Sequence, residues 1–130
     1  VEFADADNSL PEYQAFEALH QEKAGGDPGP FAANSFDMIN LVALALEASG
    51  QCSGEGVNSA MRDVSDGGDA VASFAEGKAA IAAGQDINYE GASGPLVFDE
   101  SGTVAGAYTI QAAEGGEWVN TQFYPASSFE

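Results

Sequence analysis

The chain has 130 residues, of which 21 are Asp or Glu and three are Lys or Arg, giving a formal net charge of −18. This charge argues against binding to nucleic acid or to anionic membrane surfaces, because both require a basic protein face. The length suits one domain with a modest core. The most apolar stretch, residues 38–48, contains Asn40 and Glu47, so it indicates a core helix and not a membrane span.

The excess of acidic side chains has two interpretations. A solvated, self-repelling surface is the ordinary one. A calcium-binding surface is the alternative, since hard cations are held by clustered oxygen ligands, although no acidic segment continues with the spacing of an EF-hand loop. The single cysteine, Cys52, predicts either a free thiol or a disulfide with a cysteine outside this chain.

Helix signals dominate the first part of the chain. Residues 1–9 are mostly polar and acidic and predict an extended linker. Apolar residues then recur every three positions between residues 10 and 19, which predicts an amphipathic helix that the Gly25-Gly26 pair ends. Further helices are expected, separated by glycine-containing loops, over residues 31–49, 53–64 and 73–83.

Strand signals dominate from residue 86 onward. Residues 86–89 precede a Gly-Ala-Ser-Gly-Pro bend, in which Gly permits the positive φ of a tight corner and Pro fixes φ. Short strands are expected at residues 96–98, 104–111 and 118–123, with a Gly-Gly hairpin turn before the last one. Helices first and strands last predict an α+β fold of about four helices and then an antiparallel hairpin or meander. Residues 1–130 would form one domain, with a tail at residues 125–130.

No residue pattern indicates catalysis. His20 is the only histidine, and a general base would need a nucleophile or an orienting carboxylate held beside it. Ser93 lies in the glycine-rich bend without a Gly-x-Ser-x-Gly elbow, which favours a turn residue over a nucleophile. One His and one Cys do not suit a zinc site, and no phosphate-binding loop is present. We therefore expect no enzymatic activity, no metal and no cofactor.

Two segments of the sequence resemble one known family. Residues 87–95 read Ile-Asn-Tyr-Glu-Gly-Ala-Ser-Gly-Pro and are followed by Phe-Asp, Gly and Ala-Tyr. Residues 30–37 read Pro-Phe-Ala-Ala-Asn-Ser-Phe-Asp and lead into the apolar helix, with Phe36 at the family's usual Tyr position and Met38 at its usual Ala position. In this order they are similar to the C-terminal part of the Leu/Ile/Val class of periplasmic substrate-binding proteins of ABC importers.

The resemblance implies a larger protein and a binding function. The chain would be the last third of a two-lobe α/β periplasmic binding protein of type I. That protein would bind an amino acid, branched-chain in the resembled class, or an amide-like small polar ligand by lobe closure and without catalysis. Its location would be periplasmic or extracellular, and its partners would be ABC permease subunits. The alternatives are a ligand-sensing domain of a receptor or regulator with the same fold, and a stand-alone acidic cation-binding domain.

The resemblance also selects the candidate ligand-binding residues, Phe31 and Asn34. The aromatic position that matches Phe31 lies at the ligand cleft in this family and packs on the ligand's side chain, and Asn34 is its neighbour. Both lie at the start of an expected helix, where backbone N–H groups are exposed and can face a cleft. The alternative for Phe31 is a core residue or a hydrophobic staple, and the alternative for Asn34 is a helix cap.

Overall fold

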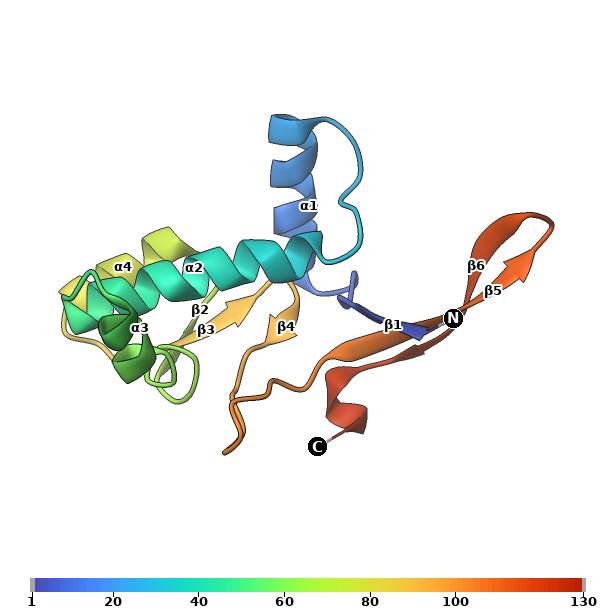
Figure 1. The fold of residues 1–130 in the computed structure, drawn as a ribbon. Coiled ribbons are helices and arrows are strands. Elements are labelled where there is room, and N and C mark those ends of the chain that lie inside the picture. Colours follow the sequence, from blue (N-terminus) through green and yellow to red (C-terminus); the bar gives the residue numbers. More distant parts are fainter. Residues whose placement is uncertain (1, 130) are drawn as a thin grey trace.

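A computed structural model describes the backbone of residues 2–129 and the side chains of residues 6–129. The helices are α1 (Pro11–Ala24), α2 (Ala32–Ser49), α3 (Gly54–Ala60) and α4 (Phe74–Ala82), and a 3-10 turn, η1 (Ala126–Ser128), lies near the C-terminus. The strands are β1 (Glu2–Asp5), β2 (Asp69–Val71), β3 (Ile87–Gly91), β4 (Gly94–Pro95), β5 (Ala107–Glu114) and β6 (Glu117–Tyr124). The predicted α+β class is confirmed, with an antiparallel hairpin after the helices (Figure 1).

The described strands form two separate three-stranded sheets. One has the order β1-β5-β6 and is antiparallel throughout. The other has the order β2-β3-β4, in which β2 runs parallel to β3 and β4 runs antiparallel to it. Residues 6–10 lead from β1 to α1, and residues 96–106 connect the two sheets. In Figure 1, α1 rises from the N-terminal end of α2, and the β5–β6 hairpin projects away from the helices.

The larger core lies between helices α2, α3 and α4 and the sheet β2-β3-β4. Leu44, Val64, Ile87 and Tyr89 are its largest fully buried side chains. Gly77 lets α4 approach this core, because a Cβ at that position would overlap the side chain of Leu44. The glycine that weakens the helix signal of residues 73–83 is therefore needed for packing.

A smaller cluster fastens α1 to the start of α2. The rings of Phe16 in α1 and Phe36 in α2 have centroids 5.1 Å apart. Buried Ala6, Ala33 and Ala92 complete the cluster. Since Ala6 follows β1 and Ala92 belongs to the bend after β3, the cluster joins four segments at the N-terminal end of α2.

The structure differs from the sequence prediction in several short segments. Residues 1–9, predicted as an extended linker, contain β1, which pairs with β5. Residues 96–98 form no strand, only an isolated bridge between Phe98 and Val104. The predicted tail, residues 125–130, contains η1. Val1 and Glu130, at the ends of the predicted linker and tail, lie outside the described residues.

Each of these differences has a physical cause. β1 and the unpredicted β2 are four and three residues long, too short to show an alternating pattern, and their partners lie far away in the sequence. Residues 96–106 connect the two sheets, so no neighbouring strand lies beside most of them and β5 begins only at Ala107. One further difference is that the helix predicted over residues 53–64 already ends at Ala60.

None of the helices formed by residues 2–129 has the length and apolar character needed to cross a membrane.

Candidate functional site

The start of α2 has an unusual backbone conformation at Phe31. This residue has φ = 61° and ψ = 8°, and it is the only non-glycine residue with a positive φ in the described part of the chain. A left-handed conformation costs an L-residue about 1–2 kcal/mol. The side chain is 54% exposed, so Phe31 is not a core residue. An exposed aromatic ring is thus held in place at some conformational cost.

The start of α2 has no side-chain cap. The Ala32 N–H donates to the Gly29 carbonyl and the Ser35 N–H donates to the Phe31 carbonyl, but no side chain caps the helix at Phe31. Asn34 is half-buried, and its side chain has no hydrogen bond to another residue within the described range. Asn34 therefore does not act as the helix cap, and its amide is available to other partners.

Phe31 and Asn34 line the same pocket, which has a volume of about 190 Å³. The opposite wall comes from the β5–β6 hairpin through Gln111 and Asn120. The Gln111 amide Nε2 donates to the Asn120 Oδ1 over 2.6 Å, so the two strands present a linked pair of amides. The structure thus places the two predicted site residues opposite polar side chains that the sequence interpretation did not select.

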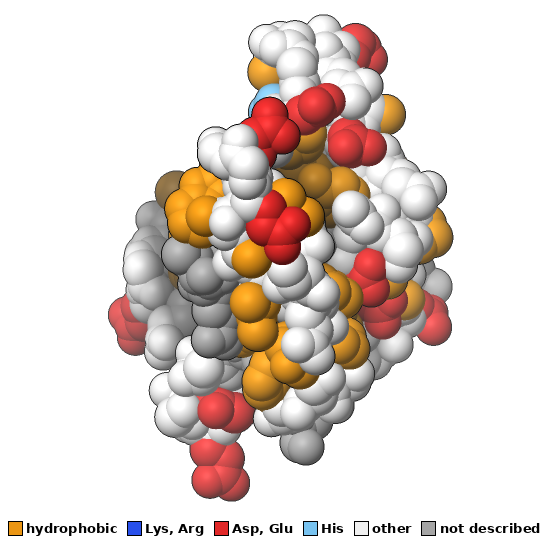
Figure 2. Space-filling model, turned by 90° about the vertical axis from the view of Figure 1, so that its right-hand side faces the viewer, with side chains coloured by type: hydrophobic (Ala, Val, Ile, Leu, Met, Phe, Trp, Pro, Cys, Tyr) orange, Lys and Arg blue, Asp and Glu red, His pale blue; other side chains and the backbone are white. Residues whose placement is uncertain are grey.

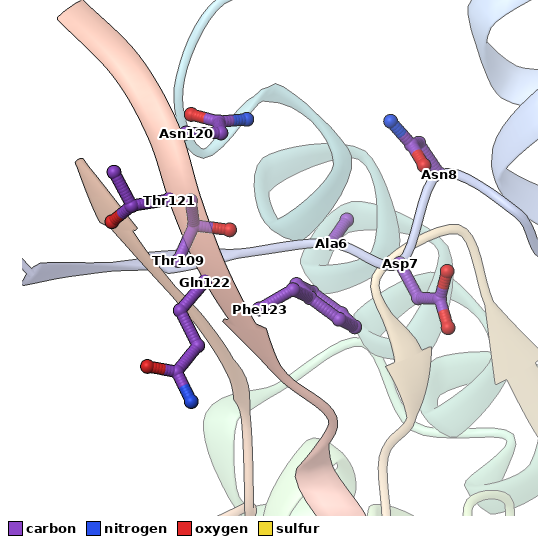
Figure 3. A pocket seen from close by; sticks show the side chains of 8 residues that line it. All are labelled: Ala6, Asp7, Asn8, Thr109, Asn120, Thr121, Gln122 and Phe123. Carbon is purple, nitrogen blue, oxygen red and sulfur yellow. The ribbon is translucent and has the colours of Figure 1, made fainter.

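A second pocket adjoins this one along the hairpin. Its volume is about 290 Å³, and it shares Ala6 and Asn120 with the first pocket. Figure 3 shows the Phe123 ring extending from β6 toward Asp7, with Asn120 and Thr121 further along the strand. Because they share a wall, the two pockets form one polar depression between α2, the residues after β1, and the hairpin. We call it the hairpin pocket.

The missed residues Gln111 and Asn120 had only a weak signal in the sequence. They lie on β5 and β6 at paired positions next to a β-bulge, where the register shifts between Ile110 and Gln111. Paired residues on neighbouring strands point to the same face of the sheet. The predicted hairpin placed the two strands side by side, but it did not pair Gln111 with Asn120 or bring this face to the start of α2.

Another cavity, with a volume of about 720 Å³, lies between the 96–106 connection and the C-terminal residues. It is lined by Phe98, Tyr108 and Phe129 among others. Neither Phe31 nor Asn34 contributes to it, so it is separate from the hairpin pocket.

The two sequence segments that carry the family resemblance meet at Asp37. Its carboxylate is fully buried and accepts hydrogen bonds from the backbone N–H groups of Ala92 and Ser93 over 2.9 and 2.6 Å. It also accepts from the hydroxyls of Ser93 and Tyr89 over 2.5 and 3.0 Å. A buried carboxylate needs such compensation, because an unpaired charge in a core is strongly destabilising. Asp37 therefore fixes the bend after β3 to the first turns of α2.

The tyrosine that contacts Asp37 has a perturbed ionisation. Burial, the charge of Asp37 and their hydrogen bond raise the pKa of Tyr89 well above its usual range. Asn40 donates to the same phenolic oxygen over 3.1 Å. The result is a polar network around Asp37, and neither Asp37 nor Tyr89 lines the hairpin pocket.

The residues considered for catalysis are not assembled into a reactive site. The Ser93 hydroxyl donates to Asp37 inside the bend, where it satisfies the buried carboxylate. The His20 Nδ1 lies 3.2 Å from the Gly26 carbonyl oxygen at the end of α1. Within residues 6–129, no three His, Cys, Asp or Glu side chains are grouped so that they could hold a metal ion.

Basic side chains lie away from the hairpin pocket. Lys23 pairs with Glu22 and Lys78 pairs with Glu47. Arg62 donates to the Phe98 carbonyl, and neither Lys nor Arg lines either part of the pocket. The face in Figure 2 accordingly shows scattered Asp and Glu side chains and no visible Lys or Arg.

Residues 1–115 match the family described as "Receptor family ligand binding region". Since the match extends over most of the chain, the chain belongs to this family of ligand-binding regions. Its fold is also similar to that of the leucine-binding protein LivK from Thermotoga maritima MSB8, with a TM-score of 0.64 at 18% sequence identity. That similarity covers 98% of this chain and 31% of the LivK chain, so this chain spans less than a third of the length of that protein. No curated protein sequence is significantly similar to it.

The family and the fold confirm the resemblance to type I periplasmic binding proteins that the two motifs indicated. The roles of Phe31 and Asn34 in binding a ligand remain predictions.

Proposed function

We propose that this chain is part of the solute-binding component of an ABC importer and helps to bind an amino acid or an amide-like small polar ligand, without catalysis. The observation that carries this proposal is the hairpin pocket. It brings Phe31 and Asn34 opposite Gln111 and Asn120. Membership of a ligand-binding family supports a binding role, and the similarity of fold to a leucine-binding protein supports an amino acid as ligand.

Phe31 would supply the main apolar contact. An exposed aromatic ring at the mouth of a polar pocket can cover the apolar part of a small ligand. The conformational cost at Phe31 is also consistent with a binding site, because strained residues concentrate at such sites. Asn34 would add hydrogen bonds from its side-chain amide.

Binding would shift the protein toward a closed state. A ligand held between two walls favours the arrangement in which it contacts both of them, which is how lobe closure is coupled to binding. The closed protein would then dock on permease subunits in the periplasm or outside the cell.

The test is calorimetric titration of amino acids into the complete product of the gene that encodes this chain. Phe31→Ala should lower the affinity by about tenfold or more, equivalent to about 1.4 kcal/mol. Phe129→Ala is a matched control, because Phe129 is equally exposed and lies in a different cavity. Equal affinities for wild type and Phe31→Ala would remove Phe31 from the site, and no binding of any amino acid would refute the proposed ligand class.

A ligand-sensing domain of a receptor is the second candidate, and the description of the matching family as a receptor region favours it. Import and sensing differ in what binding triggers. Deletion of the gene should abolish uptake of the radiolabelled ligand if the protein feeds an importer. If uptake is unchanged and a transcriptional or motile response to the ligand is lost, the receptor function is correct.

A further inference from the structure

The hairpin pocket has a consistent lining chemistry. The polar residues along it are mostly Asn and Gln: Asn8, Asn34, Gln111, Asn120 and Gln122. Gln122 pairs with Ile110 on the other side of the bulge, so its side chain points to the opposite face of the hairpin from Gln111 and Asn120. Thr109 and Thr121 also line it, but Thr109 is buried and the Thr121 hydroxyl donates to the Ile110 carbonyl. Carboxamides both donate and accept hydrogen bonds, so this wall can pair with a ligand group that does the same.

The lining offers little to a branched aliphatic group. No Val, Leu, Ile or Met is among the residues that line either part of the pocket. The large apolar side chains are the aromatic rings of Tyr13, Phe31 and Phe123. An aliphatic side chain placed here would cover amides without replacing the hydrogen bonds they make to water, which is unfavourable.

The lining offers an anionic group no positively charged side chain. Its one charged side chain is Asp7, whose Oδ1 accepts from the backbone N–H and the hydroxyl of Ser9 over 2.9 and 2.6 Å. In a chain of net charge −18, a second carboxylate at this position would meet repulsion without a cation beside it.

We propose that the hairpin pocket takes a neutral carboxamide side chain, so that the ligand is an amino acid of the glutamine or asparagine type and not a branched-chain or acidic one. This inference rests on the proposed function and specifies its ligand. Phe31 would cover the methylene groups of the ligand, and the amides of Asn34 and Asn120 would pair with its carboxamide.

The discrimination follows from the hydrogen bonds. A carboxamide exchanges its bonds to water for bonds to Asn34 and Asn120, whereas the isosteric leucine side chain makes no hydrogen bond to the Asn34 amide that it would cover. Glutamate differs from glutamine by a single group and tests the charge separately. The preference for the carboxamide should be about tenfold or more over each competitor.

The experiment titrates L-glutamine, L-asparagine, L-leucine and L-glutamate into the complete gene product, as wild type, Asn120→Ala and Asn58→Ala. One of the two carboxamide amino acids should bind at least about tenfold more tightly than leucine and glutamate. Asn120→Ala should reduce that ratio while affecting leucine little. Asn58→Ala should leave it unchanged, because Asn58 is an exposed residue on α3 that lines neither part of the pocket. Circular dichroism verifies that all three proteins are folded.

The outcomes distinguish failure of the carboxamide inference from failure of the proposed amino-acid binding. If leucine binds as tightly as glutamine and asparagine, the carboxamide inference is overturned while amino-acid binding stands. If no amino acid binds but acetamide or myo-inositol binds in a manner that depends on Asn120, the proposed amino-acid function fails and the polar subsite stands. If none of these probes binds, both are wrong.

Discussion

Gly91 at the end of β3 lies directly against the carboxylate of Asp37 in α2, so closely that a Cβ on residue 91 would overlap that carboxylate. Gly91 is buried and does not have a positive φ. Its glycine is therefore required by the close approach of a buried charge and not by backbone conformation.

Gly91→Ala should destabilise the protein. The added methyl must displace Asp37 from its hydrogen bonds or push β3 away from α2, and overpacking of this kind costs about 1–3 kcal/mol. Urea unfolding followed by circular dichroism measures the change. Gly54→Ala is the control, since Gly54 has open space around it and no positive φ, and it should shift the free energy of unfolding by about 0.5 kcal/mol or less. Similar losses in both variants would contradict the close contact.

Replacing the acceptor Asp37 should cost more stability than removing one of its hydrogen-bond donors. Tyr89→Phe removes one of the four hydrogen bonds to the carboxylate and should cost about 0.5–1.5 kcal/mol. Asp37→Asn replaces a charged acceptor with an amide that presents N–H groups to backbone donors, and it should cost more, about 3 kcal/mol. The free energies of unfolding of the two variants are compared in urea. A smaller loss for Asp37→Asn would mean that the carboxylate is not the centre of the network.

Stability should fall steeply at high pH because of Tyr89. Its pKa is raised in the folded protein above the ordinary tyrosine value near 10. A raised folded pKa contributes stability that is complete below the unfolded pKa and is lost as the pH rises through the folded value. The free energy of unfolding should therefore decline above about pH 10 by up to about 1.4 kcal/mol per pH unit more than in Tyr89→Phe. Urea unfolding of both proteins at several pH values between about 9 and 12 tests this, and parallel curves would refute it.

The left-handed backbone at Phe31 should be detectable by substitution. Glycine adopts this conformation without strain, whereas alanine does not. Phe31→Gly should therefore be about 1 kcal/mol more stable than Phe31→Ala, although both lack the ring. Thermal unfolding compares the two. If the alanine variant were as stable as the glycine variant, residue 31 would not be left-handed in solution.

The sequence predicted the elements whose signals are local. The Gly25-Gly26 stop of α1 and the Gly-Gly turn of the hairpin are both found in the structure. The bounds of α2 were predicted to within a residue, because a long apolar helix that ends at a left-handed Gly50 has a strong pattern.

The unpredicted parts depend on contacts between distant residues. β1 and β2 become strands only because β5 and β3 lie beside them. For the candidate site, family resemblance selected Phe31 and Asn34, but Gln111 and Asn120 face them only through the placement of the hairpin. Asp37 could be recognised as part of a motif and as a charge before an apolar helix, yet its partners lie 52 to 56 residues away.

The large sequence separation between Asp37 and the bend that it binds has a consequence for hydrogen exchange. The amide hydrogens of Ala92 and Ser93 belong to a tight turn, and turn amides ordinarily exchange with solvent through small local fluctuations. Here their acceptor is a side chain from a helix 55 and 56 residues earlier, so they can be released only when α2 separates from the bend. These two amides should therefore exchange as slowly as those of the core strand β3, and their exchange rate should report unfolding of the whole unit.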